Sequence, residues 1–153
     1  MNKMIDKFKD NDQTAIIYDG KKYSYNELYI KINEIESFIK DKIKSGEVVA
    51  ILADYSFVSI ALFFALYENK NIIAPITSTS KKEIDGKVKE SFSTKIINLE
   101  NEKIVITNIK SEASHKIIND LQTSKCAGLI LFSSGSTGAP KAMIHNLDTL
   151  VDS

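Results

Sequence analysis

The sequence contains no arginine and no tryptophan, and it has one cysteine among its 153 residues. All 20 basic residues are therefore lysine, so no planar guanidinium can grip a phosphate through two parallel hydrogen bonds. The single thiol, Cys126, excludes a disulfide within the chain and a cysteine metal cluster. It is typical of a protein kept in a reducing cytosol. We interpret Cys126, which precedes an apolar run, as a buried small hydrophobic residue.

The chain also lacks an excess of charge of either sign, because 20 acidic residues balance the 20 lysines. A surface for nucleic acid or anionic membrane would show a surplus of basic residues, so neither partner is expected. Long hydrophobic runs are missing too. The most apolar stretch, Phe57–Tyr67, is far shorter than the roughly 20 residues of a bilayer span and predicts a buried helix. No secretory core is present at the N-terminus, so a cytoplasmic location without a membrane span is predicted.

β-prone runs alternate with helical patterns along the chain. Continuous apolar runs rich in Ile and Val are typical of parallel strands that are covered on both faces. The expected strands are Val48–Leu52, Ile72–Ile76, Lys95–Leu99, Lys103–Thr107 and Ala127–Phe132. Two helices are expected to start after Ser24 and Ser56, and two more are expected at about Lys81–Glu90 and Ala113–Gln122. The alternation predicts an α/β fold with a largely parallel sheet and flanking helices, in one domain over residues 1–153.

Local signals add detail to this α/β prediction. Asp19-Gly20 separates two β-prone runs and is a favoured turn pair, so a short β-hairpin is expected before the sheet. Ser24 and Ser80 are each followed three residues later by Glu, which is the spacing of a capping box. Pro75 is expected to mark the exit of its strand or an edge of the sheet.

The strand Ala127–Phe132 runs into the segment "SSGSTGAPK", Ser133–Lys141. Its small residues alone would suit a flexible linker. Two features favour a ligand site instead. A buried strand feeds the segment directly, and ligands of open α/β sheets bind beyond the carboxyl ends of the strands. The segment also ends in Pro-Lys rather than continuing as Ser and Gly.

The residue types of this segment suit a phosphate group. Gly135 and Gly138 allow positive φ angles and a close backbone approach, and successive N–H groups in such a turn can form an anion-binding nest. Small hydroxyl side chains add donors, and a lysine adds a point charge. The predicted phosphate-binding residues are Ser133, Ser134, Gly135, Ser136, Thr137, Gly138 and Lys141. The spacing fits neither a Walker A loop nor a dinucleotide glycine fingerprint.

The stretch "LFSSGSTGAPKAMIH" resembles the signature phosphate loop of the adenylate-forming (AMP-binding, ANL) superfamily, which includes acyl-CoA synthetases, peptide adenylation domains and luciferase. The family pattern is an apolar strand, Thr/Ser-Ser-Gly-Ser/Thr-Thr-Gly, any residue, Pro and Lys, and Ser133–Lys141 meets every fixed position. "YSYNELYIKINEIESFIK" looks like the family's opening helix, and "EVVAILADYSFVSIALFFALYENKNIIAPIT" looks like its next strand–helix–strand segment. The second stretch departs from the usual Asn-Ser-Pro and Ala-Gly turns, at scaffold positions.

The resemblance implies an acyl-CoA synthetase-like ligase. A carboxylic acid would be activated by ATP and magnesium as an acyl-adenylate, and a thiol of coenzyme A or a carrier protein would take the acyl group. Members of the family are much longer, and their later motifs supply the magnesium, ribose and catalytic residues. We therefore expect neither catalytic nor metal-ligating residues here. The chain is expected to be the N-terminal portion of a larger AMP-binding domain, inactive alone and prone to self-association through uncovered apolar surface.

A second hypothesis is a self-contained nucleotide-phosphate-binding or interaction module without catalysis. The histidines do not help to decide. His115 is interpreted as a solvated residue on a short polar helix, and His145 as a packed structural residue, because no acid partner stands near it in sequence. The acyl substrate, the thiol acceptor and the oligomeric state are not predicted.

Overall fold

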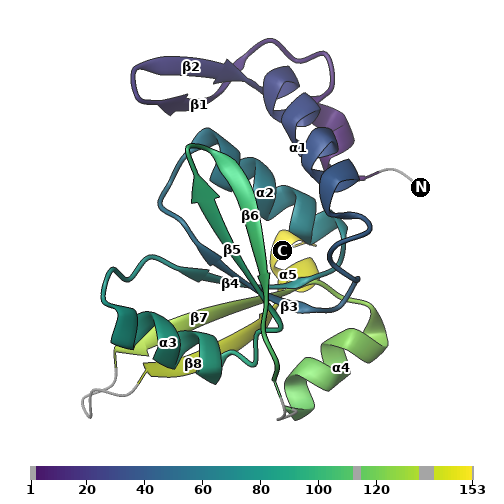
Figure 1. Cartoon of the computed structure of the whole chain (residues 1–153). Coiled ribbons are helices and arrows are strands. Elements are labelled where there is room, and N and C mark those ends of the chain that lie inside the picture. Colours follow the sequence, from purple (N-terminus) through teal and green to yellow (C-terminus); the bar gives the residue numbers. More distant parts are fainter. Residues whose placement is uncertain (1–2, 112–114, 135–139, 153) are drawn as a thin grey trace.

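The computed structural model describes residues 3–111, 115–134 and 140–152 (Figure 1). A six-stranded sheet lies at its centre, in the order β6-β5-β3-β4-β7-β8. Neighbours among β3, β4, β5 and β7 pair in parallel, while β6 and β8 pair antiparallel with β5 and β7. The strands are β3 Val48–Leu52, β4 Ile72–Ile76, β5 Lys95–Glu100, β6 Lys103–Asn108, β7 Gly128–Ser134 and β8 Pro140–Asn146. The predicted α/β fold with a largely parallel sheet is confirmed.

Helices cover both faces of this sheet. They are α1 Tyr25–Ile39, α2 Phe57–Glu68, α3 Lys81–Glu90, α4 Lys116–Ser124 and α5 Leu147–Asp152. Successive strand residues point to opposite faces, so Val49 and Ile73 join the core under α1 and α2, while Val48 and Ile72 join the core under α4. Two hydrophobic cores therefore share one sheet.

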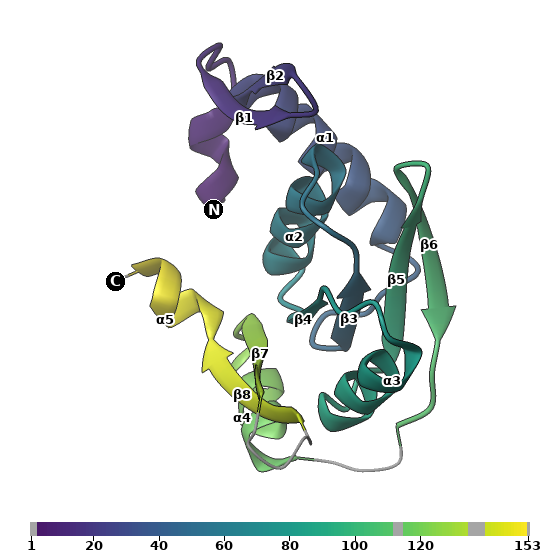
Figure 2. The ribbon, with the colours of Figure 1, turned by 90° about the vertical axis from the view of Figure 1, so that its left-hand side faces the viewer.

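The apolar run predicted to be a buried helix is α2. It lies between α1 and the sheet (Figure 2). Ala61, Leu62, Ala65 and Leu66 are fully buried. A helix that is hydrophobic all round is expected where both of its sides are covered. Burial within the protein thus explains why this run is apolar on all sides.

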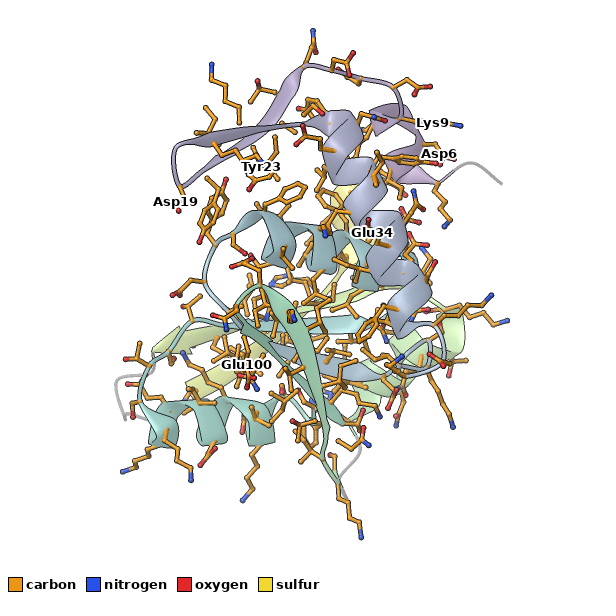
Figure 3. All side chains as sticks on the ribbon, turned by 45° about the horizontal axis from the view of Figure 1, so that its top comes forward. Asp6, Lys9, Asp19, Tyr23, Glu34 and Glu100 are labelled. Atoms are coloured by element: carbon orange, nitrogen blue, oxygen red, sulfur yellow. The ribbon has the colours of Figure 1, made fainter. Side chains whose placement is uncertain are left out.

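The predicted hairpin consists of β1 Thr14–Tyr18 and β2 Lys21–Ser24. Asp19 and Gly20 both have positive φ, 51° and 75°, as the turn that suits the twist of a hairpin requires. In Figure 3, Asp19 stands at the tip of this hairpin and Tyr23 points from β2 toward α2. The Tyr23 ring stacks on Phe57, with 4.0 Å between the ring centroids. This contact docks the hairpin on the start of α2.

The helix-start predictions have mixed outcomes. The Ser24 hydroxyl accepts a hydrogen bond from the Glu27 amide at 3.0 Å, so Ser24 caps α1, but the return bond from the Glu27 side chain that would complete the predicted capping box is not formed. Ser80 occupies the cap position of α3, but its side chain makes no cap hydrogen bond, so the capping box predicted there is wrong. α4 begins at Lys116, and the short 3₁₀ helix Met4–Phe8 (η1) was not predicted.

Strand β7 parts from β4 after two residue pairs, Ile72 with Gly128 and Ile73 with Leu129. By contrast, β3 pairs with β4 along its whole length. Pro75 lies beyond the last β4–β7 pair, so its missing N–H costs no hydrogen bond to β7. Because β4 lies between β3 and β7, it is not an edge strand. Pro75 is its penultimate residue, which agrees with the other predicted alternative, the exit of the strand. The carboxyl halves of β4 (residues 74–76) and β7 (residues 130–134) do not pair with each other, and we call the boundary between these two halves the seam.

At the opposite edge, Glu47 ties the loop before β3 to the start of β5. Its carboxylate accepts hydrogen bonds from the Lys95 ammonium at 2.7 Å, the Lys44 amide at 2.7 Å and the Thr94 hydroxyl at 3.1 Å. Burial alone would raise the pKa of the Glu47 carboxyl, but these bonds outweigh it, so the pKa lies below its ordinary value of 4.5. The folded protein thus favours the charged carboxylate.

We expect Glu47→Gln to lower the free energy of unfolding at pH 7 by about 1–3 kcal/mol, because hydrogen bonds to a charged group are lost. A carboxyl with a depressed folded pKa stabilises fully above its unfolded pKa of about 4.3, and this stabilisation is lost as pH falls through the folded pKa. Denaturant unfolding at pH 7 and pH 3 should therefore show the difference shrinking in acid. Glu83→Gln, at an exposed position of α3, is the control. A difference that is the same at both pH values would contradict this account.

Candidate functional site

Strands β7 and β8 form an antiparallel hairpin that carries the predicted phosphate segment. Ser133 pairs with Lys141, and Ser134 pairs with Pro140. The strand predicted to end at Phe132 thus continues to Ser134, and the ladder brings the two ends of the segment opposite each other. Gly135, Ser136, Thr137 and Gly138 lie outside the described residues. The structure therefore places the base of the predicted site at the carboxyl edge of the sheet.

The two faces of this hairpin have different surroundings. Phe132, Ala142 and Ile144 pack against the core under α4, which leaves Lys141 on the opposite face, where it is exposed. An exposed lysine beside the segment is free to reach an anion. On the same face, Leu131 pairs with Met143, and their exposed fractions are 41% and 45%. This apolar pair fits the expected self-association, which stays a prediction.

The structure shows where the one cysteine and the two histidines lie. Cys126 is half-buried rather than buried, against the core under α4. The His115 ring caps α4, where Nδ1 accepts a hydrogen bond from the Ile117 amide at 3.1 Å, so the prediction of a merely solvated residue is wrong. His145 is half-buried in β8, opposite Leu129. The surroundings of these three side chains are those of packing and helix capping, and they do not point to a catalytic role.

Helix α3 contains a residue that sequence reasoning missed. The Lys87 ammonium donates to the Ser78 hydroxyl at 2.6 Å and lies 5.7 Å from the centre of the Phe132 ring. Phe132 immediately precedes the predicted phosphate residues. The sequence offers no signal for this contact, because the "KKEIDGKVKE" run has the composition of a solvated helix face.

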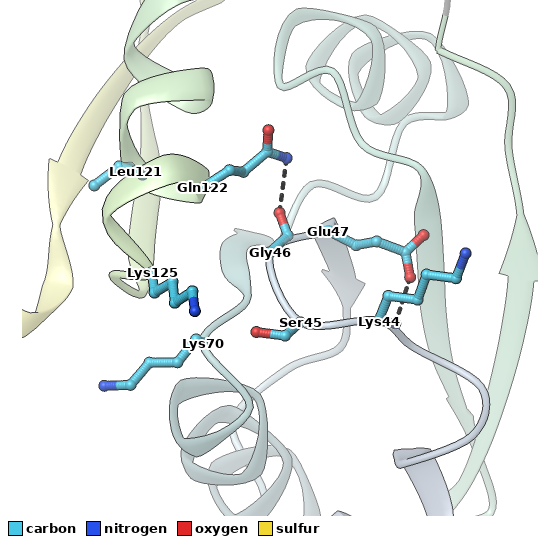
Figure 4. A pocket seen from close by; sticks show the side chains of 8 residues that line it. All are labelled: Lys44, Ser45, Gly46, Glu47, Lys70, Leu121, Gln122 and Lys125. Carbon is cyan, nitrogen blue, oxygen red and sulfur yellow. Dashed lines mark hydrogen bonds between the residues drawn. The ribbon is translucent and has the colours of Figure 1, made fainter.

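A hollow of about 520 Å³ lies at the other edge of the sheet, between the loops that precede β3 and β4 and the end of α4 (Figure 4). Gln122 closes one side by donating to the Gly46 carbonyl at 2.9 Å. Lys70 pairs with Asp148 at 3.2 Å. Lys70 and Lys125 follow the C-terminal ends of α2 and α4, where lysines offset the negative end of a helix dipole. Ligands of open α/β sheets bind at the carboxyl edge, so we interpret this hollow as structural.

Within residues 3–111, 115–134 and 140–152, no group of three or more His, Cys, Asp or Glu is arranged to hold a metal ion. Magnesium bound with ATP is held by phosphate oxygens, water and one or two carboxylates, whereas the predicted phosphate segment consists of Ser, Thr, Gly, Ala, Pro and Lys and therefore suits the phosphate rather than the metal. None of the helices in those ranges is both long and apolar enough to cross a bilayer.

Comparison with known proteins places these features in a family. The family description "AMP-binding enzyme" matches residues 6–153. The D-alanine–D-alanyl carrier protein ligase of Lacticaseibacillus rhamnosus is 24% identical over 162 aligned positions, which cover 96% of this chain and 32% of that protein. Bacitracin synthase 1 of Bacillus licheniformis is 26% identical over 148 positions, which cover 89% of this chain and 3% of that protein.

Solved structures show the same fold. The N-terminal subdomain of Klebsiella oxytoca NpsA, in complex with 3-hydroxyanthranilyl-AMSN, superposes with a TM-score of 0.67 at 22% identity, over 87% of this chain and 36% of that one. ATP-bound MatB of Rhodopseudomonas palustris superposes with a TM-score of 0.68 at 18% identity, over 94% and 33%. The chain spans about a third of the length of the D-alanine ligase and of both structures. With the family description matching nearly its whole length, the chain belongs to the AMP-binding enzymes of the adenylate-forming superfamily.

Proposed function

We propose that the complete protein is an ATP-dependent acid–thiol ligase, of which residues 1–153 form the N-terminal part of a larger AMP-binding domain. The observation that carries the proposal is the phosphate segment. Every fixed position of the family pattern is present, and the β7–β8 hairpin holds its two ends, Ser133 and Lys141, opposite each other at the carboxyl edge. Ligands of open α/β sheets bind at that edge.

In this proposal the segment binds the β- and γ-phosphates of ATP. Backbone N–H groups around Gly135 and Gly138 and the hydroxyls of Ser133, Ser134, Ser136 and Thr137 would donate to the phosphate oxygens. Lys141 would add a positive charge from its exposed position. Magnesium would neutralise part of the phosphate charge. Catalysis of this kind depends mainly on positioning and charge stabilisation, which suits a site without a nucleophile or general base of its own.

The reaction has two steps. A carboxylate oxygen of the acid attacks the α-phosphorus of ATP, the bond from that phosphorus to the oxygen bridging to the β-phosphate breaks, and pyrophosphate leaves. A thiolate then attacks the carbonyl carbon of the acyl-adenylate and AMP leaves, which produces a thioester. The D-alanine–D-alanyl carrier protein ligase among the relatives supports a carrier-protein thiol as acceptor, with coenzyme A as the alternative.

Pyrophosphate exchange tests this function. The complete protein is incubated with Mg-ATP, labelled pyrophosphate and, one at a time, a panel of amino acids, fatty acids and aryl acids. We expect label to enter ATP only with the acids that the protein activates. A complete protein that binds ATP but exchanges pyrophosphate with none of the acids would favour a phosphate-binding module without catalysis.

The 153-residue chain alone should bind Mg-ATP with a dissociation constant on the order of 1 mM or weaker, because a few phosphate contacts leave little surplus over the entropy lost on binding. Isothermal titration measures this affinity. A micromolar constant would support the self-contained module. Acid-dependent exchange by the chain alone would show that residues 1–153 contain catalytic groups.

A further inference from the structure

Lys87 reaches across the seam. Its ammonium donates to the Ser78 hydroxyl at 2.6 Å and lies 5.7 Å from the centre of the Phe132 ring. Ser78 belongs to the loop that follows β4, whereas Phe132 belongs to β7. The backbone ladder between these two strands has already stopped at Ile73 and Leu129. One side chain therefore links the loop after β4 to β7 at a place where the backbone ladder no longer joins the two strands.

The packing of α3 makes this contact important. None of the residues of α3 is fully buried, so hydrophobic burial contributes little to fixing its position. The helix comes close to the hairpin at Gly86, where a Cβ atom would lie 3.8 Å from Cγ of Pro140. Pro140 is the residue with which β8 begins. Lys87 thus follows the point at which α3 touches the end of the phosphate segment.

The other lysines of α3 provide a comparison. Lys81, Lys82 and Lys89 are exposed, whereas Lys87 is half-buried. A cation within about 6 Å of a ring centre is attracted to the face of the ring, and the attraction grows as water is excluded. A flexible lysine also loses side-chain entropy when it is held in one place. The half-buried position of Lys87 indicates that it specifically links Ser78 to Phe132, unlike the exposed lysines of the same helix.

We propose that Lys87 is a positioning residue for the phosphate segment. By linking the loop after β4 to β7, it fixes the base of the β7–β8 hairpin and with it the spacing between Ser133 and the loop that contains Ser78. The link to phosphate binding rests on the proposed function. The bridge across the seam does not depend on it, so the two are tested separately.

The bridge is tested by hydrogen exchange on the 153-residue chain. Lys87→Met removes the ammonium and keeps most of the side-chain length, and Lys89→Met is the matched control on the exposed side of the same helix. We expect Lys87→Met to speed exchange of the β7–β8 amides about tenfold and to leave the β5–β6 hairpin unchanged. Lys87→Arg should restore much of the protection, because a guanidinium can donate to a hydroxyl and stack on a ring. Unchanged protection of β7–β8 in Lys87→Met would overturn the proposal.

The consequence for phosphate binding is tested on the complete protein. Lys87→Met should raise the KM for ATP in pyrophosphate exchange about fivefold to tenfold with kcat little changed, and Lys87→Arg should reverse most of the rise. A KM equal to that of Lys89→Met would overturn the positioning role even if exchange of the hairpin amides had accelerated. Absence of exchange activity in the unaltered protein would instead contradict the proposed function, and the hydrogen-exchange result would still decide whether Lys87 bridges the seam.

Discussion

In the complete protein, Thr137→Ala and Gly138→Val should each reduce ATP-dependent pyrophosphate exchange by about tenfold or more. Thr137→Ala removes a hydroxyl that would donate to a charged phosphate oxygen, and one such bond is worth about 1.5–3 kcal/mol. Gly138→Val adds a branched side chain at a glycine for which we expect positive φ and a close approach to the ligand. Initial exchange rates at several ATP concentrations measure both effects.

Two further variants show whether the loss is specific to the segment. Lys141→Ala should have a smaller effect, because the ammonium is exposed and its charge is partly screened by salt. Ser80→Ala removes an exposed hydroxyl from the loop before α3, where it makes no cap hydrogen bond, and should leave exchange unchanged. Normal exchange in both Thr137→Ala and Gly138→Val would refute the assignment of the phosphate segment.

Gly128→Val should lower the free energy of unfolding by about 2–3 kcal/mol, near the top of the range for overpacked cores. Gly128 begins β7 between α4 and β4. A Cβ atom there would lie 2.9 Å from Cδ1 of Leu121 and 3.1 Å from both Cγ atoms of Ile72. Ile72 is fully buried and has no open space into which to move, whereas Leu121, which is 6% exposed, borders the hollow of Figure 4 and has space on that side only. Valine adds two further methyl groups to this clash.

Denaturant unfolding measures the effect of Gly128→Val, and two comparisons identify its cause. Adding Leu121→Ala to Gly128→Val should recover part of the loss, because it removes the nearest atom. Gly86→Ala adds a methyl group at an ordinary contact distance of 3.8 Å from Pro140 and improves helix propensity, so it should raise stability by up to about 1 kcal/mol. Wild-type stability of Gly128→Val would mean that α4 and β4 are packed more loosely than the structure shows.

The features that the sequence predicted well depend on local chemistry. The turn at Asp19-Gly20 needs only two residues that accept positive φ. The helix expected after Ser24 follows from a serine cap and from apolar residues that recur at helical spacing, and those residues are the buried ones of α1. The length and composition of Phe57–Tyr67 were enough to indicate a buried helix. The phosphate segment was found because its residues match a family pattern in order and spacing. That match gives no coordinates for residues 135–139.

The features that sequence reasoning missed depend on contacts between distant segments. Apart from Pro75, which has no N–H to donate, nothing near Ile73 or Leu129 signals that their strands part after two pairs. Lys87 has the sequence context of a solvated residue, and its contact with Phe132 exists only because the chain crosses from β4 to β5 through α3. Ser80 has the spacing of a capping box, yet its hydroxyl makes no cap bond, and nothing in the structure explains this difference.

The short join between β4 and β7 also sets an order for folding. Strands β3 and β4 and the hairpin β5–β6 connect segments that are close in sequence, whereas Ile72 meets Gly128 only after the long intervening chain has been closed into a loop. Closing that loop costs entropy before the contact repays it. Besides the two ladder pairs, the C-terminal region is tied to the rest by the Gln122–Gly46 and Lys70–Asp148 bonds, by the core that Val48 and Ile72 share with α4, and by the contact of Lys87 with Phe132. Residues 116–152 should therefore dock last during folding and detach first on partial unfolding.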